Sequence, residues 1–246
     1  MLLLNKVAVV TGAGTGVGSA IAKLFAAHGA FVALHYRNSK KSAELLAAEI
    51  GTNALAFQAD LTDIASTQTF IDGVMLRFGR IDVLVNNASG FTPGKNFELA
   101  NFGDFALEFV NVLAPTINPC KSVVPIMKTQ GTGKIINFGA TLVQRPAVDQ
   151  IVHITAKSAL LGFTRGLAKE LGPYGITVNL ISPGMTLTKY TETLPEALKS
   201  KVASETPLGR LATPEDVAHV ALFYASNLSD FVTSANISPD GGLVYL

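Results

Sequence analysis

The chain has 246 residues, of which 48% are hydrophobic and only 15% are charged, and its formal net charge is +1. No basic run exceeds the pair Lys40-Lys41, which argues against a nucleic-acid surface or an anionic-membrane surface. The single cysteine, Cys120, excludes an intrachain disulfide, and no stretch has the length of a signal peptide or a membrane span, so we expect a cytoplasmic protein.

Strand-like and helix-like segments alternate along the whole chain. Residues 7–10 are apolar at every position, as in a parallel strand that is buried on both faces. Further strands are predicted at residues 31–34, 54–57, 81–85, 135–138 and 177–181. Helices are predicted from about 17 to Gly29, at 42–50, from a cap at Thr62 to about 78, at about 101–127, at 151–171 and at 214–225. Because parallel strands need helical crossovers, the pattern predicts an α/β fold with one doubly wound parallel sheet, in a single domain of residues 1–246.

Two features of the helical pattern add to this prediction. Pro115 and Pro119 interrupt the long fourth helix, and we expect them to kink or split it. A mean hydropathy of +0.37 with so few charges indicates more apolar surface than one core buries. We therefore expect a homodimer or homotetramer, with the helix at 151–171 between subunits.

A glycine-rich turn, Thr11-Gly12-Ala13-Gly14-Thr15-Gly16-Val17-Gly18, lies between the first strand and the first helix. Glycines let a turn tighten and let the backbone approach a pyrophosphate, which then binds at the helix N-terminus. Glycines also form ordinary turns, but the strand before and the amphipathic helix after make a dinucleotide site the stronger interpretation.

The ribose position follows about 20 residues beyond such a turn, where an NAD enzyme places an acidic side chain. Here the sequence is His35-Tyr36-Arg37-Asn38-Ser39, which contains no carboxylate. A guanidinium suits a 2′-phosphate, so Arg37 favours NADP over NAD, with Ser39 as a second candidate contact. The alternative is an arginine that only faces solvent.

Further motifs follow in chain order at the strand ends. They are Asp60-Leu61, Asn86-Asn87-Ala88-Ser89, Asn111, Lys157, Pro183-Gly184 with Thr188, and Asp240-Gly241-Gly242. With the glycine turn they resemble the short-chain dehydrogenase/reductase family over nearly the whole chain. The resemblance implies a nicotinamide cofactor and a small-molecule carbonyl or alcohol substrate, with no metal.

The resemblance also assigns roles to individual positions. Asp60 would contact the adenine, Asn111 would hold a water beside the catalytic lysine, and Thr188 would belong to the loop over the nicotinamide. The implied cofactor site comprises Gly12, Thr15, Gly16, Val17, Gly18, Arg37, Ser39, Asp60, Leu61, Asn87, Ala88, Lys157, Pro183, Gly184 and Thr188. The implied catalytic residues are His153, Lys157 and Asn111.

Two positions depart from the family pattern, and both belong to the chemistry. The family places a tyrosine four residues before the lysine, where this chain has His153. The family's serine at the end of the fifth strand is replaced by Ala140, with Thr141 the nearest hydroxyl. A positioned general acid contributes about 10²–10⁴-fold to a rate, so losing both groups without a replacement would leave little activity.

Histidine is itself a competent acid, because a free imidazole has a pKa of about 6.5. The positive charge of Lys157, one helical turn away, would favour the neutral ring. Asp149, four residues before His153, would oppose this if both lie on one helix. The other interpretation is that Asp149 only caps the helix.

Three functions fit this sequence. The first is an NADP(H)-linked oxidoreductase in which His153 replaces the tyrosine as proton donor, with Lys157 and Asn111 in support. The second is a non-redox enzyme of the same fold, such as a dehydratase, isomerase or cyclase. The third is a catalytically silent cofactor-binding protein. A substrate pocket is predicted to include residues 185–204, where Tyr190, Leu194 and Leu198 would suit a hydrophobic substrate.

Overall fold

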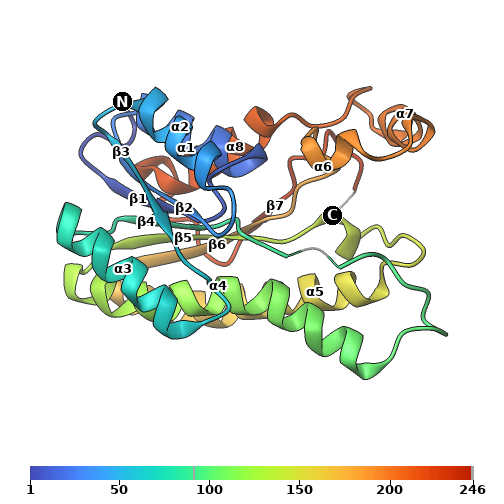
Figure 1. The fold of residues 1–246 in the computed structure, drawn as a ribbon, viewed down its shortest axis with the longest axis horizontal. Coiled ribbons are helices and arrows are strands. Elements are labelled where there is room, and N and C mark those ends of the chain that lie inside the picture. The colour runs from blue at the N-terminus through green and yellow to red at the C-terminus, as the bar shows by residue number, and fades with distance from the viewer. Residues whose placement is uncertain (91, 245–246) are drawn as a thin grey trace.

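The computed structural model describes residues 1–90 and 92–244, and one parallel sheet runs through them (Figure 1). Its order is β3-β2-β1-β4-β5-β6-β7, so the chain reverses its direction of winding between β1 and β4. The strands are β1 Val7–Val10, β2 Phe31–Tyr36, β3 Ala54–Gln58, β4 Val83–Asn86, β5 Gly133–Phe138, β6 Ile176–Ile181 and β7 Asn236–Ile237. This is the doubly wound α/β fold that the sequence predicts.

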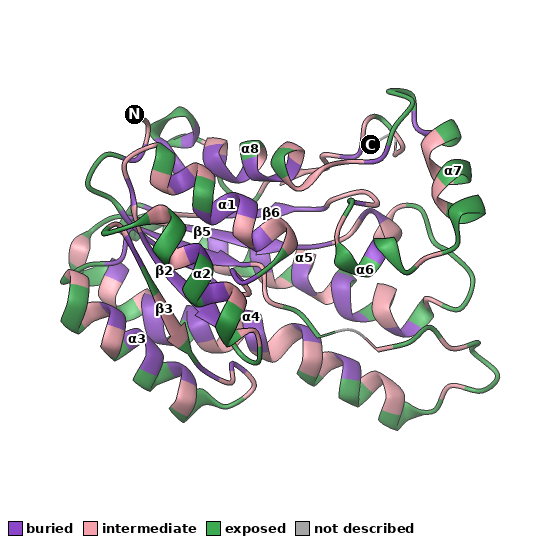
Figure 2. Cartoon of the chain, turned by 45° about the horizontal axis from the view of Figure 1, so that its top comes forward, coloured by how far each residue is buried: buried purple, intermediate pink, exposed green. Residues whose placement is uncertain are grey.

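Helices cover both faces of the sheet (Figure 1). One face carries α1 Gly16–Ala27, α2 Lys40–Ile50 and α8 Pro214–Ala225, and the other carries α3 Ile64–Phe78, α4 Phe102–Gln130 and α5 Ile151–Leu171. Their buried sides face the strands (Figure 2), which gives an apolar core on each side of the sheet. Within the described residues, no helix combines the length and hydropathy that a membrane span requires.

The predicted bounds of α5 and α8 agree with the structure, whereas the cap of α3 and the region after β6 differ. The cap of α3 is Asp63, whose carboxylate accepts hydrogen bonds from the N–H groups of Ala65 and Ser66. The prediction that Thr62 caps this helix was therefore wrong. The hydroxyl of Thr62 instead donates to Asp60 at 2.7 Å. The sequence patterns did not predict the short strand β7 or the two helices α6 Lys189–Glu192 and α7 Glu196–Glu205, which form an arm beyond the sheet (Figure 1).

Of the two outcomes expected at the prolines, a kink or a split, the split was wrong, because α4 continues through Pro115, Pro119 and Pro125. Pro115 has no N–H for the carbonyl of Asn111, one turn earlier. The N–H of Gly90, in the loop after β4, donates to that carbonyl at 2.9 Å instead. This N–H from outside the helix thus satisfies the carbonyl that Pro115 leaves without a donor. The helix begins with a capping box formed by Asn101 and Asp104.

Side chains from neighbouring strand ends fix the glycine turn after β1. The amide of Asn87 donates to the carbonyls of Thr11 at 2.9 Å and Gly12 at 3.2 Å. The N–H of Gly12 donates to Nδ1 of His35 at 3.1 Å, and Nε2 of the same ring donates to the carbonyl of Ala59 at 3.1 Å. His35 therefore joins the ends of β1, β2 and β3 while its ring is neutral.

Burial of His35 lowers its pKa from 6.5 to about 4, although the Ala59 carbonyl and Asp60 oppose the shift. The folded protein therefore resists a proton that the unfolded chain accepts. The stabilising contribution of the neutral ring is complete above about pH 6.5 and is lost as the pH falls through about 4, and it amounts to about 3 kcal/mol.

We expect His35→Asn to flatten the loss of stability between pH 6.5 and 4, because the variant has no imidazole at this position that takes up a proton when the chain unfolds. Urea unfolding of native protein and variant across this pH range would measure the difference. His219→Asn, at an exposed position of α8, is the control and should follow the native curve. Parallel curves for native protein and His35→Asn would show that the buried ring does not titrate as inferred.

Candidate active site

A cavity of about 580 Å³ opens at the carboxyl ends of the strands, where the winding reverses. Asn111 of α4 lines it, together with most of the predicted cofactor residues. These are Gly12, Thr15, Gly16, Val17, Arg37, Ser39, Asp60, Leu61, Asn87, Ala88 and Thr188. The structure thus brings residues from much of the chain into one site.

The turn at the floor of this cavity suits a pyrophosphate. Gly12 and Gly16 have φ angles of +64° and +56°, which side chains other than glycine rarely adopt. A Cβ on Gly14 would collide with Ser39. Thr15, the N-cap of α1, makes no side-chain cap bond, so the first N–H groups of α1 remain available to an anion.

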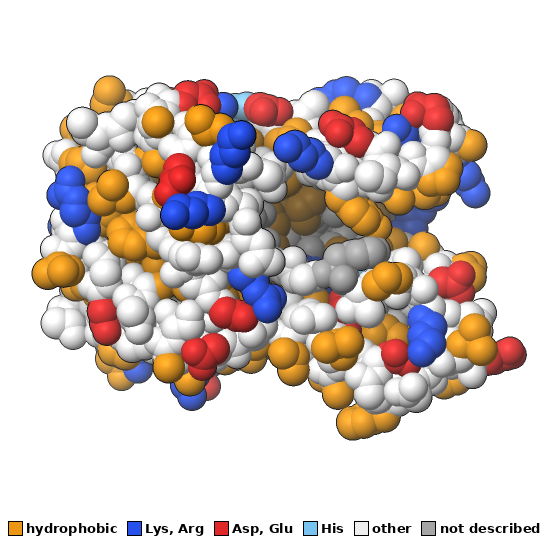
Figure 3. Space-filling view, viewed as in Figure 1, with side chains coloured by type: hydrophobic (Ala, Val, Ile, Leu, Met, Phe, Trp, Pro, Cys, Tyr) orange, Lys and Arg blue, Asp and Glu red, His pale blue; other side chains and the backbone are white. Residues whose placement is uncertain are grey.

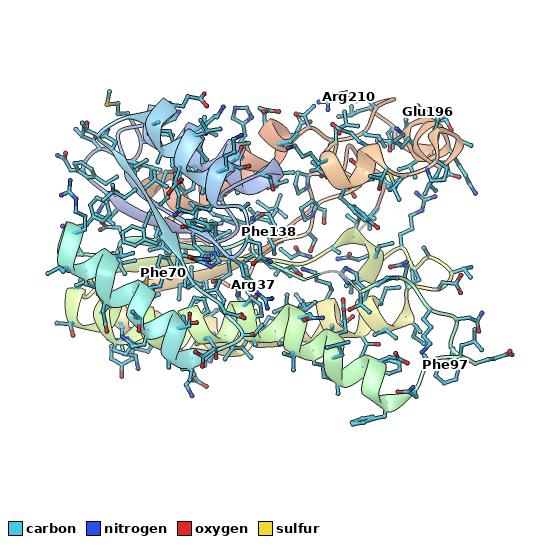
Figure 4. The ribbon with its side chains drawn as sticks, viewed as in Figure 1. Arg37, Phe70, Phe97, Phe138, Glu196 and Arg210 are labelled. Atoms are coloured by element: carbon cyan, nitrogen blue, oxygen red, sulfur yellow. The ribbon has the colours of Figure 1, made fainter. Side chains whose placement is uncertain are left out.

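Arg37 lines the cavity (Figure 4) and forms an ion pair with Asp60, with 2.9 Å between Nη2 and Oδ2. Asp60 also accepts two hydrogen bonds from Thr62. These bonds, and then the charge of Arg37, hold the pKa of Asp60 below its usual value. The guanidinium is more than half exposed, so it has room to contact a further anion.

Several lining residues were missed from the sequence: His35, Asn38, Thr62, Ser89, Gly90, Pro115 and Lys189. Most adjoin a predicted position, so their place beside a strand end was a usable signal. Tyr190, predicted for the substrate pocket, also lines the cavity from α6. Figure 3 shows the surface hollowed between the arm of α6 and α7 and the pair α4 and α5.

Four predicted cofactor residues do not line this cavity. A Cβ on Gly18 would collide with the Gly12 carbonyl, so this glycine permits close packing inside the turn. The carbonyl of Pro183 accepts a hydrogen bond from Thr141, and Gly184 lies against Asp240. Lys157, the fourth, is buried beneath the strand ends.

Lys157 extends from α5 to the end of β5, where its Nζ donates to the carbonyl of Phe138 at 3.0 Å. Burial lowers the pKa of Lys157 from 10.5 to about 8, and the carboxylate of Glu108 opposes part of this shift. The lysine therefore combines a buried amine with a nearby negative charge. Asn111, the other predicted catalytic residue, has its side-chain amide 3.5 Å from the Thr92 hydroxyl.

His153, one turn before Lys157 on α5, forms a pair that the sequence analysis missed. Its Nδ1 lies 2.7 Å from Oε1 of Glu108, a residue of α4 with no exposed side-chain surface. No group in residues 1–90 and 92–244 hydrogen-bonds to the second oxygen, Oε2. The carboxylate thus lies close to an imidazole and a buried lysine. His153 itself is not among the residues that line the cavity.

Both interpretations of Asp149 were wrong. The N-cap of α5 is Gln150, and Asp149 lies outside the helix, exposed, with a φ angle of +63°. Asp149 is therefore not one helical turn from His153, and Glu108 provides the carboxylate instead. Thr141 does not replace the missing serine, because its hydroxyl donates to the Pro183 carbonyl at 3.1 Å.

Residues 12–244 match the family model described as enoyl-(acyl carrier protein) reductase. The chain is 36% identical to the 3-oxoacyl-[acyl-carrier-protein] reductase FabG of Chlamydia muridarum, covering 98% of both chains. It is 37% identical to a cyclohexanol dehydrogenase of Rhodococcus sp., covering 99% of this chain and 97% of the relative. A 3-ketoacyl-(acyl-carrier-protein) reductase of Brucella melitensis, solved in complex with NADH, has a TM-score of 0.92 and 32% identity, covering 98% of this chain and 99% of that one.

These matches extend over nearly all of the chain and agree with the glycine turn, the strand-end motifs and the strand order. The chain therefore belongs to the short-chain dehydrogenase/reductase family, and is a nicotinamide-dependent oxidoreductase of that family with a small-molecule substrate.

Proposed function

We propose that this protein is an NADP(H)-dependent oxidoreductase that interconverts a carbonyl compound and its alcohol, with His153 in place of the family's tyrosine. Residues 1–246 would form one cofactor-binding domain. The observation that carries this proposal is the position of His153, which lies one turn before buried Lys157 and is held by buried Glu108 at 2.7 Å. An imidazole fixed in this way can serve as a general acid and base.

The residues present account for both halves of the reaction. When bound, the nicotinamide cofactor supplies or accepts the hydride. In reduction, His153 gives a proton from Nε2 to the carbonyl oxygen as the carbon receives the hydride. In oxidation, the neutral ring takes the hydroxyl proton back. Lys157 would supply positive charge one helical turn from His153. Ala140 has no hydroxyl and the Thr141 hydroxyl is engaged with Pro183, so His153 is the group proposed to donate to this oxygen.

The preference for NADP(H) follows from Arg37 and Ser39 at the ribose end of the cavity. The Brucella melitensis relative was solved with NADH, so the fold alone does not select the phosphorylated cofactor. A 2′-phosphate beside Arg37 would share the guanidinium with Asp60. Because the guanidinium presents five N–H donors, it can bond to both anions.

Of the residues predicted for the substrate pocket, Tyr190 lines the cavity, and Leu198 of α7 is more than a third exposed. The named relatives act on a 3-oxoacyl group and on cyclohexanol, respectively. We infer a hydrophobic ketone or secondary alcohol as the substrate class.

We expect native protein to bind NADPH more tightly than NADH, and Arg37→Ala to weaken NADPH binding by about 10-fold or more while NADH affinity changes little. The loss corresponds to one charge-assisted contact. Fluorescence titration with both cofactors measures it. Arg77→Ala, an exposed arginine of α3, is the control. Equal affinities of the native protein for the two cofactors would contradict the preference.

His153→Ala should lower the reductive turnover of a ketone substrate by about 10²-fold or more, the size of a general-acid contribution. NADPH affinity should remain within about twofold of native, because His153 does not line the cofactor cavity. Steady-state kinetics and cofactor titration on the same preparation separate the two effects. His219→Ala serves as a control on the exposed side of α8. Undiminished turnover in His153→Ala would show that the imidazole is not the acid.

We also propose that the protein is a homodimer or homotetramer with α5 between subunits. Gly162 and Gly166 are exposed on α5, and no atom lies within 4 Å of where their Cβ atoms would be, so another helix can approach closely. Light scattering should give a multiple of 25.8 kDa. Gly162→Glu should shift the mass towards the monomer, whereas Leu76→Glu, on the exposed face of α3, should not. A monomeric native protein would contradict the assembly.

A further inference from the structure

We propose that Glu108 is the positioning residue for His153: it fixes the ring and its tautomer, and the two residues form one functional unit that replaces the family's tyrosine. This inference rests on the proposed function, because it assigns His153 the proton transfer. Glu108 does not contact the substrate in this scheme. It acts through the imidazole, 2.7 Å away.

The burial of Glu108 is the first argument. Its side chain has no exposed surface, and its helix face continues into Val112, which belongs to an apolar cluster with Ala156 and Leu160 of α5. A buried carboxylate costs several kcal/mol unless a cation or strong donors compensate for the lost water. The nearest such group is the ring of His153, and the positive charge of Lys157 lies nearby. The imidazole is therefore what allows an acid at this position.

The geometry also determines which ring nitrogen takes part in the reaction. A carboxylate only accepts, so the short contact requires that Nδ1 carries a hydrogen. Nε2 is then the nitrogen that gains and loses the substrate's proton. During reduction, Nε2 gives its proton to the carbonyl oxygen, the Nδ1–H bond to Glu108 remains, and the carboxylate takes up no proton. The acid–histidine pair of serine hydrolases follows the same principle.

The pair also explains why a tyrosine at this position would not restore the family's chemistry by itself. A phenol has one O–H and no N–H, so it cannot satisfy Glu108 and also donate to a substrate. Beside an unpaired buried carboxylate, the O–H would bond to that carboxylate. The substitution at position 153 and the acid at position 108 therefore depend on each other.

The first test measures the tautomer and turnover together. In NMR spectra of protein labelled with ¹⁵N-histidine, the signal of His153 is the one that is absent from His153→Ala. In native protein, this signal should show the Nδ1–H tautomer. Glu108→Leu should shift it towards Nε2–H and lower kcat by about 10-fold or more, with NADPH affinity unchanged. Glu108→Gln keeps an acceptor oxygen, so its tautomer population and its kcat should lie between those of native protein and of Glu108→Leu. Asp149→Asn, which changes an exposed carboxylate four residues before His153, should match native protein in every measurement.

The tautomer separates this inference from the proposed function. If native protein turns over no ketone but Glu108→Leu shifts the tautomer, the positioning role stands and the proposed reaction fails. An unchanged tautomer in both Glu108 variants, or native kcat in Glu108→Leu, would overturn the inference. If Glu108→Leu does not fold, the same criteria apply to Glu108→Gln, whose shape matches the native side chain.

The second test rebuilds the family's residues with and without the acid. His153→Tyr combined with Ala140→Ser should reduce the ketone poorly, compared with native protein, while Glu108 is present. Adding Glu108→Leu should raise ketone reduction by about 10-fold or more, because the phenol is then free to donate. Equal activity of the two rebuilt proteins would show that Glu108 does not engage the residue at position 153, and would overturn the proposed dependence.

Discussion

Parallel alignment of the strands is the constraint on which the site depends. Because β1, β2, β4 and β5 run in one direction, the residues that follow each of them meet at a single edge of the sheet. There Asn87 and His35 hold the glycine turn from both sides. The conformation of the glycine turn therefore depends on two neighbouring strand ends as well as on its own glycines.

The group formed by Glu108, His153 and Lys157 is built differently, from two helices that pack together on one face of the sheet. α4 provides Glu108, and α5 provides His153 and Lys157. One buried negative charge thus faces two side chains that can carry positive charge. The usual tyrosine would place no second titratable cation here. The exchange of one side chain therefore changes the charge balance of an otherwise apolar helix interface.

Much of this arrangement could be predicted from the sequence, because it depends on local patterns. Gly172-Pro173 ends α5 at the expected residue, and the glycine turn marks the cavity floor. The continuity of α4 through Pro115 could not be predicted, because the donor that compensates for Pro115 comes from Gly90, in a distant loop. The partner of His153 lies 45 residues away in the sequence. The expectation that residues four apart on a helix share a face led to Asp149 instead. A usable signal did exist, since Glu108 shares a helix face with Val112 and Pro115, which are both buried.

The hydrogen bond between Gly90 and the carbonyl of Asn111 has a consequence for how α4 can vary. It connects the helix to the loop after β4, the loop in which Asn87 holds the glycine turn. Glu108 lies three residues earlier on the same helix, so the position of its carboxylate is set relative to that loop. One residue inserted between Glu108 and Asn111 would rotate the carboxylate by about 100° around the helix axis and away from α5. The number of residues between these two positions is therefore as constrained as their chemical identity.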